Sequence, residues 1–321
     1  MSPVDQHIPV LKREVLSAIQ VRRDGLYVDA TFGRGGHAGE IVALLGDEGR
    51  LIALDRDPQA VAAGRQRFAE DDRVTIVQGE FRRMFDLLKD YLHDQKVDGV
   101  LMDLGVSSPQ LDQADRGFSF MRDGELDMRM DPTQGESAAE WLARVEESDL
   151  VKVLFTLGEE KFARRIAKAI VLEREQQAIT STLQLAQIIA DSIPKREKHK
   201  HPATRTFQAI RMFVNQELEQ INQALPQAVS LLNEGGRLAV ISFHSLEDRL
   251  VKRFMRKHAT PNLPPRSIPV TEADYATPLT LIGRAIKPSK HELEENPRAR
   301  SSVLRVAERT AVPFVAEVVH A

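Results

Sequence analysis

The chain of 321 residues contains no cysteine. Without a thiolate it cannot form a disulfide, hold zinc or an iron–sulfur cluster through cysteine, or use a cysteine nucleophile. It also lacks any apolar run near the ~18 residues that a membrane helix needs. Its polar N-terminus has no apolar block of the kind found in a signal peptide. We therefore expect a cytoplasmic protein with no membrane partner and no metal site.

Neither sign of charge is in large excess. The 44 Lys and Arg residues face 47 Asp and Glu residues, which gives a formal net charge of −3. Proteins that bind nucleic acid present basic surfaces, so any such surface here has to be local. The content of 42% hydrophobic and 28% charged residues is typical of a soluble globular protein. The length allows one large domain or two ordinary ones.

The segment 27–37 predicts a strand, a glycine-rich turn and the start of a helix. Its glycines let the backbone turn sharply and approach a ligand at points where a Cβ would intervene. A second predicted strand, 51–54, ends in Asp55 roughly 20 residues past the last of these glycines. A carboxylate at this position can accept hydrogen bonds from both hydroxyls of a ribose. The sequence therefore predicts a site for an adenosine-containing cofactor.

The turn formally fits the G-x-G-x-x-G/A pattern of dinucleotide sites, so NAD stays an alternative. Two acids favour S-adenosylmethionine. Asp29 ends the first strand, where it can receive the amino group of an amino-acid-bearing cofactor. Asp103 ends the fourth strand and starts a polar loop at the crevice where open α/β sheets bind ligands. Methylation at C5 of a pyrimidine typically uses a thiolate, so the absence of cysteine leaves transfer to an exocyclic nitrogen open.

Apolar runs alternating with helical patterns predict an α/β fold with a parallel sheet. The predicted strands are 27–28, 51–54, 74–77, 100–102, 238–243 and 303–306. Asp57 suits the N-cap of the helix after the second strand, and Pro58 suits its first turn. Ser245 and Asp248 suggest another capping pair. We expect one long amphipathic helix over 207–225.

The long interval between the fourth and fifth strands has little strand character, and we interpret it as an inserted domain. Helices are expected there at 138–145, 149–157, 160–174 and 183–193. Residues 113–204 are expected to form this helical substrate-recognition domain. Residues 1–112 and 205–321 are expected to form one discontinuous cofactor-binding domain.

Seven sequence motifs indicate a known family. They lie at 29–37, 103–111, 116–122, 126–131, 201–208, 241–248 and 296–303. They resemble the bacterial RsmH (MraW) family of small-subunit ribosomal RNA cytosine-N4 methyltransferases, and the resemblance runs from His7 to Glu308. It implies a Rossmann-like class I methyltransferase sheet that transfers methyl from S-adenosylmethionine to N4 of a specific cytidine in the decoding region of 16S ribosomal RNA. The family's cofactor contacts carry over to Gly35, Gly36, His37, Asp55, Phe81, Asp103 and Gln110.

Asp103 is the predicted catalytic residue. The N4 lone pair of cytosine is delocalised into the ring, so a carboxylate that accepts its N–H favours the nucleophilic geometry and can relay the proton lost after transfer. The alternative is that Asp103 only binds the cofactor. Ser107 and Ser108 are candidates for the base pocket. Phe118 and Phe120 are candidates for stacking on the base, with core packing as the alternative.

Local clusters of basic residues predict where RNA binds. They comprise Lys195, Arg196, Lys198 and Lys200 in a linker, Lys161, Arg165 and Lys168 on one helix face, and Arg298 and Arg300. The expected partner is small-subunit ribosomal RNA within a ribosomal subunit, and a homodimer is a further expectation. Two rival functions are a nicotinamide-dependent oxidoreductase and a non-catalytic ribosome-assembly factor.

Overall fold

A computed structural model describes residues 9–194, 201–264, 267 and 270–315. The predicted basic linker with Lys195, Arg196, Lys198 and Lys200 lies outside these residues. No helix of the described part is long and apolar enough to cross a membrane.

Contacts divide the chain into two compact units. The sheet unit comprises Met1–Gly105 and Leu218–Ala321, and the helical unit comprises Val106–Glu217. The helical unit is wider at both ends than the expected 113–204. The reason is that the segments flanking that range contribute apolar side chains to the core of the helical unit, among them Leu111 and Phe207.

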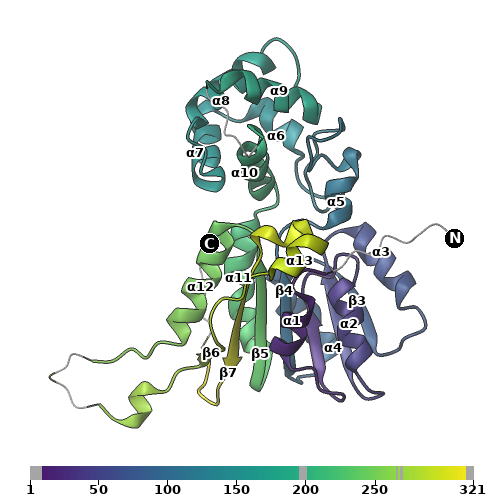
Figure 1. The fold of residues 1–321 in the computed structure, drawn as a ribbon, viewed down its shortest axis with the longest axis vertical. Helices are drawn as coiled ribbons and strands as arrows, with labels where there is room; N and C mark the ends of the chain where they lie inside the picture. The colour runs from purple at the N-terminus through teal and green to yellow at the C-terminus, as the bar shows by residue number, and fades with distance from the viewer. Residues whose placement is uncertain (1–8, 195–200, 265–266, 268–269, 316–321) are drawn as a thin grey trace. The chain divides into compact units, whose positions relative to one another are not determined.

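The sheet unit contains a seven-stranded sheet of order β3-β2-β1-β4-β5-β7-β6 (Figure 1). The strands are β1 (Leu26–Asp29), β2 (Arg50–Asp55), β3 (Val74–Gln78), β4 (Val97–Asp103), β5 (Leu232–Ser242), β6 (Leu279–Leu281) and β7 (Val303–Arg309). The first five pair in parallel, and β7 is antiparallel to both β5 and β6. Because the strand order reverses between β1 and β4, their carboxyl ends form the topological switch point where such sheets bind ligands. The expected α/β class is confirmed, and β6 is a strand that the sequence did not indicate.

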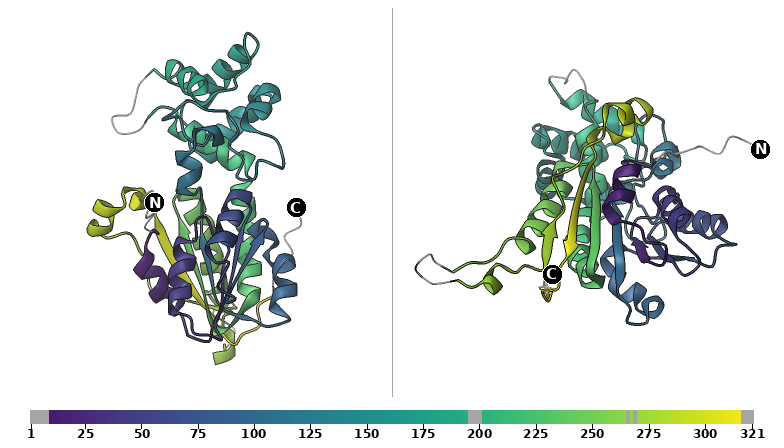
Figure 2. Two further views of the ribbon diagram at one scale, coloured as in Figure 1. Left: turned by 90° about the vertical axis from the view of Figure 1, so that its right-hand side faces the viewer. Right: turned by 60° about the horizontal axis from the view of Figure 1, so that its bottom comes forward.

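Helices cover both faces of the sheet, as Figure 2 shows. Consecutive residues of β2 and β4 alternate between two separate apolar clusters, so each strand is buried on both sides. The helices of this unit are α1 (Lys12–Ile19), α2 (Gly36–Leu44), α3 (Pro58–Arg67), α4 (Met84–Leu92), α11 (Glu217–Leu231), α12 (Ser245–His258) and α13 (Lys290–Glu295). This double covering explains why the strands are near-continuous apolar runs in the sequence.

The two predicted caps have different outcomes. The Asp57 carboxylate accepts the N–H of Gln59 at 2.9 Å ahead of α3, which confirms that cap. The predicted pair of Ser245 and Asp248 is wrong. The capping box of α12 consists of His244 and Glu247. Asp248 instead accepts hydrogen bonds from Arg305 of β7 at 2.7 and 3.0 Å, since it lies a residue too far along the helix to reach the N-cap amide.

The helical unit is built from short helices around its own apolar core. They are α5 (Ser108–Asp112), α6 (Ala138–Arg144), α7 (Glu147–Gly158), α8 (Ala163–Arg174), α9 (Thr182–Ser192) and α10 (Thr204–Val214). Ile166, Ile189 and Ile210 are fully buried in this core. The four helices expected inside the insertion are confirmed, with ends shifted by a few residues.

The expected single helix over 207–225 is wrong, because the chain breaks into α10 and α11. Gln216, between them, has a left-handed φ of 51°. The side-chain amide of the preceding Asn215 donates to the carbonyl of Arg211 at 2.9 Å and to that of Met128 at 2.7 Å. Hydrogen bonds of an Asn side chain to the backbone compete with helical continuation, which an apolar repeat does not register.

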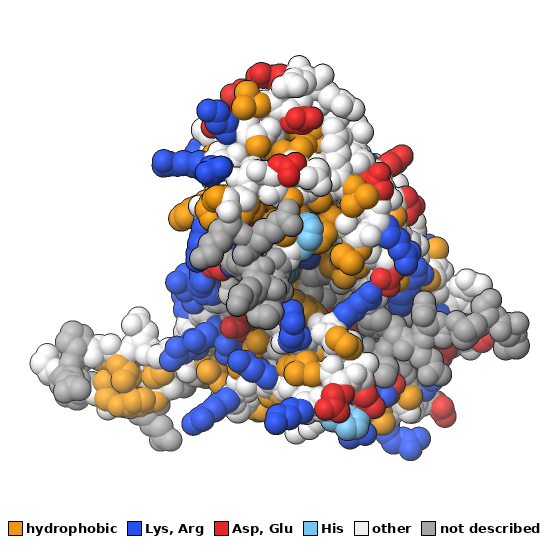
Figure 3. Space-filling model, turned by 45° about the horizontal axis from the view of Figure 1, so that its top comes forward, with side chains coloured by type: hydrophobic (Ala, Val, Ile, Leu, Met, Phe, Trp, Pro, Cys, Tyr) orange, Lys and Arg blue, Asp and Glu red, His pale blue; other side chains and the backbone are white. Residues whose placement is uncertain are grey.

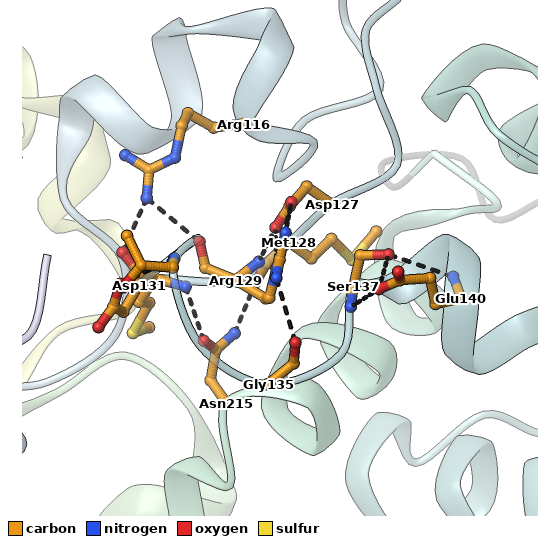
Figure 4. Close-up of polar contacts among 11 residues, drawn as sticks. Arg116, Asp127, Met128, Arg129, Asp131, Gly135, Ser137, Glu140 and Asn215 are labelled. Carbon is orange, nitrogen blue, oxygen red and sulfur yellow. Dashed lines mark hydrogen bonds and ion pairs between the residues drawn. The ribbon is translucent and has the colours of Figure 1, made fainter.

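The same Asn215 anchors the loop 126–137 of the helical unit (Figure 4). Its Oδ1 accepts the N–H of Met130 at 2.8 Å. Arg116 donates to the carbonyls of Arg129 and Met130 at 3.1 and 2.8 Å. Met128, fully buried, adopts a left-handed φ of 62°, a conformation that side chains rarely adopt without such support. The motif at 126–131 therefore forms a loop whose backbone is held rigid by these hydrogen bonds.

Candidate functional site

The glycine-rich turn between β1 and α2 is tightly constrained. Gly35 has a φ of 70°, and a Cβ there would come within 2.6 Å of the Phe32 ring. Its N–H donates to the Phe32 carbonyl at 2.7 Å. Arg67 of α3 donates to the carbonyls of Arg34 and Gly35, both at 2.8 Å. The turn therefore leads into the N-terminus of α2, at Gly36 and His37, with a fixed backbone.

Asp55, at the end of β2, supports this turn directly. One carboxylate oxygen accepts the N–H of Gly33 at 2.7 Å, and the other accepts the N–H of Asp57 at 2.9 Å. Burial raises the pKa of Asp55 to about 6, although both backbone hydrogen bonds act to lower it. A carboxylate has about four acceptor positions, so two remain for the hydroxyls of a ribose.

Two further acids lie at the ends of the neighbouring strands β1 and β4. Asp29 is only 1% exposed and accepts the N–H of Thr31 at 3.1 Å. Burial, and to a smaller degree the charge of Asp55, raises its pKa to about 7. The backbone N–H of Asp103 donates to the Thr31 hydroxyl at 2.6 Å. Thr31 therefore holds the two acids in a fixed relation at the switch point of the sheet.

Asp103 has the most perturbed carboxyl group of the three. Burial, with smaller contributions from the charges of Asp29 and Glu247, raises its pKa to about 8. Its Oδ2 lies 3.8 Å from Nε2 of His37. Its Oδ1 is shielded from solvent and accepts no hydrogen bond from the described residues. A buried acceptor without a donor is unfavourable by about 1–3 kcal/mol, so an N–H donor presented to this carboxylate would be stabilised.

Glu247 is a functional candidate that sequence reasoning missed. It is fully buried at the start of α12, where Oε2 accepts the N–H groups of Phe243 and His244 at 2.8 and 3.0 Å. Its charge contributes to the raised pKa of Asp103. The spacing from His244 to Glu247 fits a capping box with an unusual first residue, which was the available signal in the sequence.

The other predicted site residues fall in both units. Phe81 begins a short 3-10 helix, Phe81–Arg83, after β3 in the sheet unit. Ser107, Ser108 and Gln110 belong to the helical unit. Ser107 and Gln110 form the capping box of α5, with the Ser107 N–H donating to Gln110 Oε1 at 3.0 Å, and Ser108 is the first residue of that helix. A cofactor contact of Gln110 and a base contact of the two serines stay predictions.

The two candidate stacking residues have different surroundings. Phe118 is buried in the core of the helical unit, with the Arg116 guanidinium 5.8 Å from its ring centre. Phe120 is half-buried and stacks on His201, with ring centres 4.5 Å apart and planes 24° apart. Core packing therefore accounts for Phe118, whereas Phe120 and His201 form an aromatic pair with an exposed member.

The predicted basic face of α8 is confirmed. Arg165 and Lys168 are exposed on α8, whereas Ile166 and Ile170 on the other face are fully buried; Lys161 is also exposed but lies just before the helix. Figure 3 shows blue Lys and Arg side chains along the left side of one face of the molecule. Arg298 and Arg300 are also exposed; they lie in the short 3-10 helix Pro297–Ser301 of the sheet unit.

Comparison with known proteins gives one consistent result. Residues 5–310 match the MraW methylase family. A protein of Idiomarina loihiensis named ribosomal RNA small subunit methyltransferase H is 57% identical over 306 residues, which cover 95% of this chain and 97% of that protein. A protein of Shewanella amazonensis with the same name is 55% identical over 316 residues, which cover 98% of this chain and all of that protein. The chain belongs to the MraW methylase family.

Proposed function

We propose that this methylase transfers a methyl group from S-adenosylmethionine to N4 of a specific cytidine in the decoding region of 16S ribosomal RNA. The names of its relatives support small-subunit ribosomal RNA as the substrate. The observation that carries the choice of an amine is Asp103, a carboxylate at the switch point whose buried Oδ1 accepts no hydrogen bond from the described residues.

The sheet unit has features that fit this cofactor. S-adenosylmethionine supplies an electrophilic methyl group on a positively charged sulfur. The acceptor positions left on Asp55 suit ribose hydroxyls, and buried Asp29 suits an ammonium group. Gly35, Gly36 and His37 bring backbone close to this edge of the sheet, where a Cβ on Gly35 would not fit. Phe81 follows β3 at the same edge and is the proposed neighbour of the adenine.

Asp103 then acts on the amine of the base. In its ionised form it accepts an N–H of the cytosine N4 group, which frees the nitrogen lone pair from the ring and orients it. The same carboxylate can take the proton that the nitrogen loses after the transfer. Its pKa of about 8 is suited to holding that proton near neutral pH.

A stripe of basic residues on α12 supports RNA as the substrate. Five exposed cations recur at helical spacing along one side of this helix, over roughly 12 Å. They are Arg249, Lys252, Arg253, Arg256 and Lys257. Of the two acids of this helix, Glu247 is buried and Asp248 pairs with Arg305. A stripe of this kind matches the charge of a phosphate backbone.

The test is methyl transfer from labelled S-adenosylmethionine to small ribosomal subunits and to free 16S RNA that lack the modification. We expect the label in subunits, as N4-methylcytidine at a single position mapped by mass spectrometry. Asp103→Asn should lower kcat by at least 100-fold, because an amide cannot take the proton. Asp90→Asn, at an exposed position of α4, is the matched control. Label at another atom, or full activity of Asp103→Asn, would contradict the proposal. Binding of subunits without any transfer would favour an assembly factor.

A further inference from the structure

The helical unit has a groove along α7 and the start of α8, with a volume of about 500 Å³. It is lined by Val151, Lys152, Phe155, Thr156, Lys161, Phe162, Ala163, Arg164 and Arg165. The groove lies wholly within this unit and shares no residue with the site described above in the sheet unit.

The chemistry of the groove is basic and aromatic. Its nine lining residues include four cations and no acid. Lys152 pairs with Asp149 at 2.8 Å, but both side chains are largely exposed, so this ion pair is weak and readily exchanged. Nε of Arg165 donates to the carbonyl of Ser192, which orients the rest of its guanidinium without neutralising it. The groove is therefore a concentration of positive charge.

Helix stability does not explain these cations. Arg164 and Arg165 lie in the first turn of α8, and Lys161 lies just before it. The N-terminus of a helix carries a partial positive charge, so acids stabilise it and cations destabilise it. The first turn of α8 has no acid. The carboxylate at this end is that of buried Glu160, which accepts the N–H of Phe162 at 2.9 Å. An anion bound to the exposed cations would stabilise this end of the helix further.

The aromatic component is Phe155, which is 66% exposed on α7. A ring at this level of exposure offers a flat apolar surface on which another aromatic group can stack. Phe162, a second aromatic residue that lines the groove, is half-buried and packs on the core of the unit. An exposed ring set among cations matches the two requirements for binding single-stranded nucleic acid, which are a surface for stacking a base and charges that follow the phosphates.

We propose that this groove binds a single-stranded segment of the substrate RNA, with a base stacked on Phe155 and phosphates held by Lys161, Arg164 and Arg165. This deepens the proposed function and rests on RNA being its substrate. The groove should bind flexible, unpaired RNA, because the bases of a duplex are stacked inside it and cannot reach the Phe155 ring.

The test uses the full chain with a short unstructured oligoribonucleotide and with small ribosomal subunits. Phe155→Ala should raise the Kd for the oligoribonucleotide roughly ten-fold. The triple variant K161A, R164A and R165A should lower the slope of log K against log salt by about 2. Both variants should raise KM for subunits while kcat and the affinity for S-adenosylmethionine stay unchanged.

Matched controls come from the sheet unit. Phe85→Ala removes a ring that is 50% exposed, and the triple variant R65A, R83A and K89A removes three exposed cations. Neither should change RNA affinity. If the groove variants bind the oligoribonucleotide like the wild type while the wild type methylates RNA, the groove proposal is wrong. The proposal is also wrong if the groove variants lose affinity for subunits but not for the oligoribonucleotide, since the groove would then bind a ribosomal protein. If the wild type methylates nothing while the groove variants still lose RNA affinity, the proposed function fails and the groove stands.

Discussion

If Asp29 receives the cofactor's ammonium group, as proposed above, binding of S-adenosylmethionine should weaken as the pH falls from 7.5 to 6, because this carboxyl group has to be ionised. Burial raises the pKa of Asp29 to about 7, so its ionised fraction is about 0.75 at pH 7.5 and about 0.1 at pH 6. If only the ionised form binds, the apparent affinity falls about eight-fold over this range.

Asp103 increases this effect. Its pKa of about 8 means that the ligand-free protein holds a proton there as well, and a positively charged sulfur nearby favours the release of that proton. S-adenosylhomocysteine has the ammonium group but no charge on its sulfur. It should therefore show the dependence that comes from Asp29 and less of the dependence that comes from Asp103.

The assay is isothermal titration calorimetry in two buffers that differ in ionisation enthalpy, which gives both the affinity and the number of protons released. Asp29→Asn should bind more weakly at pH 7.5, and at pH 6, where the wild-type carboxyl is about 0.9 protonated, its binding should release about 0.9 proton fewer. Asp90→Asn should behave like the wild type, since this side chain is exposed on α4. A wild-type affinity that is constant from pH 6 to 7.5 with no proton release would refute the reasoning, as would an unchanged pH dependence in Asp29→Asn.

Three further predictions concern stability. Gly35→Ala should lower the free energy of unfolding by about 1–3 kcal/mol in denaturant titrations, because its Cβ meets an aromatic ring at 2.6 Å; Gly235→Ala, with a φ of 75° and open space around it, should lower it by about 1 kcal/mol. Arg211→Met removes the guanidinium that donates to both oxygens of the buried Glu217 carboxylate at 2.7 and 2.8 Å, so it should destabilise the helical unit by about 3–5 kcal/mol, measured by hydrogen exchange. The double variant with Glu217→Leu should regain most of this stability. If it does not, the ion pair is not the cause of the loss. Because folding raises the pKa of Asp103, the ligand-free protein should lose stability as the pH rises from about 4 to about 8; Asp103→Asn should therefore raise the melting temperature at pH 8 and leave it unchanged at pH 4.

Most of the sheet could be predicted because its signals are local. Strands covered on both faces appear as continuous apolar runs, and β2 and β4 were found on that basis. The glycine turn and Asp55 follow one another at a spacing set by the βαβ unit, so their proximity could be expected, and the N–H of Gly33 donates to Asp55 at 2.7 Å. The three-residue strand β6 could not be found, because it exists only by pairing with β7.

The break between α10 and α11 shows where a periodic pattern stops being informative. Apolar residues keep helical spacing across it, and nothing in that spacing marks Asn215. At the break, the Asn215 side chain donates to the carbonyl of Arg211 within α10 and to that of Met128, 87 residues earlier in the chain, which it reaches only in the folded unit. Residues so far apart in the sequence come into contact only through tertiary packing, which a local hydrophobic pattern cannot indicate.

For the acid cluster, the sequence predicts the positions of the residues but not their pKa values. Each of Asp29, Asp55 and Asp103 could be identified from its place after a strand, but their raised pKa values could not, because these depend on which strands become neighbours and how deeply their ends are buried. That burial disfavours the ionised carboxylates in the ligand-free protein. A positively charged methyl donor reverses the preference, since it stabilises the charges that burial disfavours. The same buried carboxylates therefore lower the stability of the ligand-free protein above about pH 4 and favour the binding of a cationic cofactor. The number of protons released in the calorimetric experiment measures how far cofactor binding ionises them.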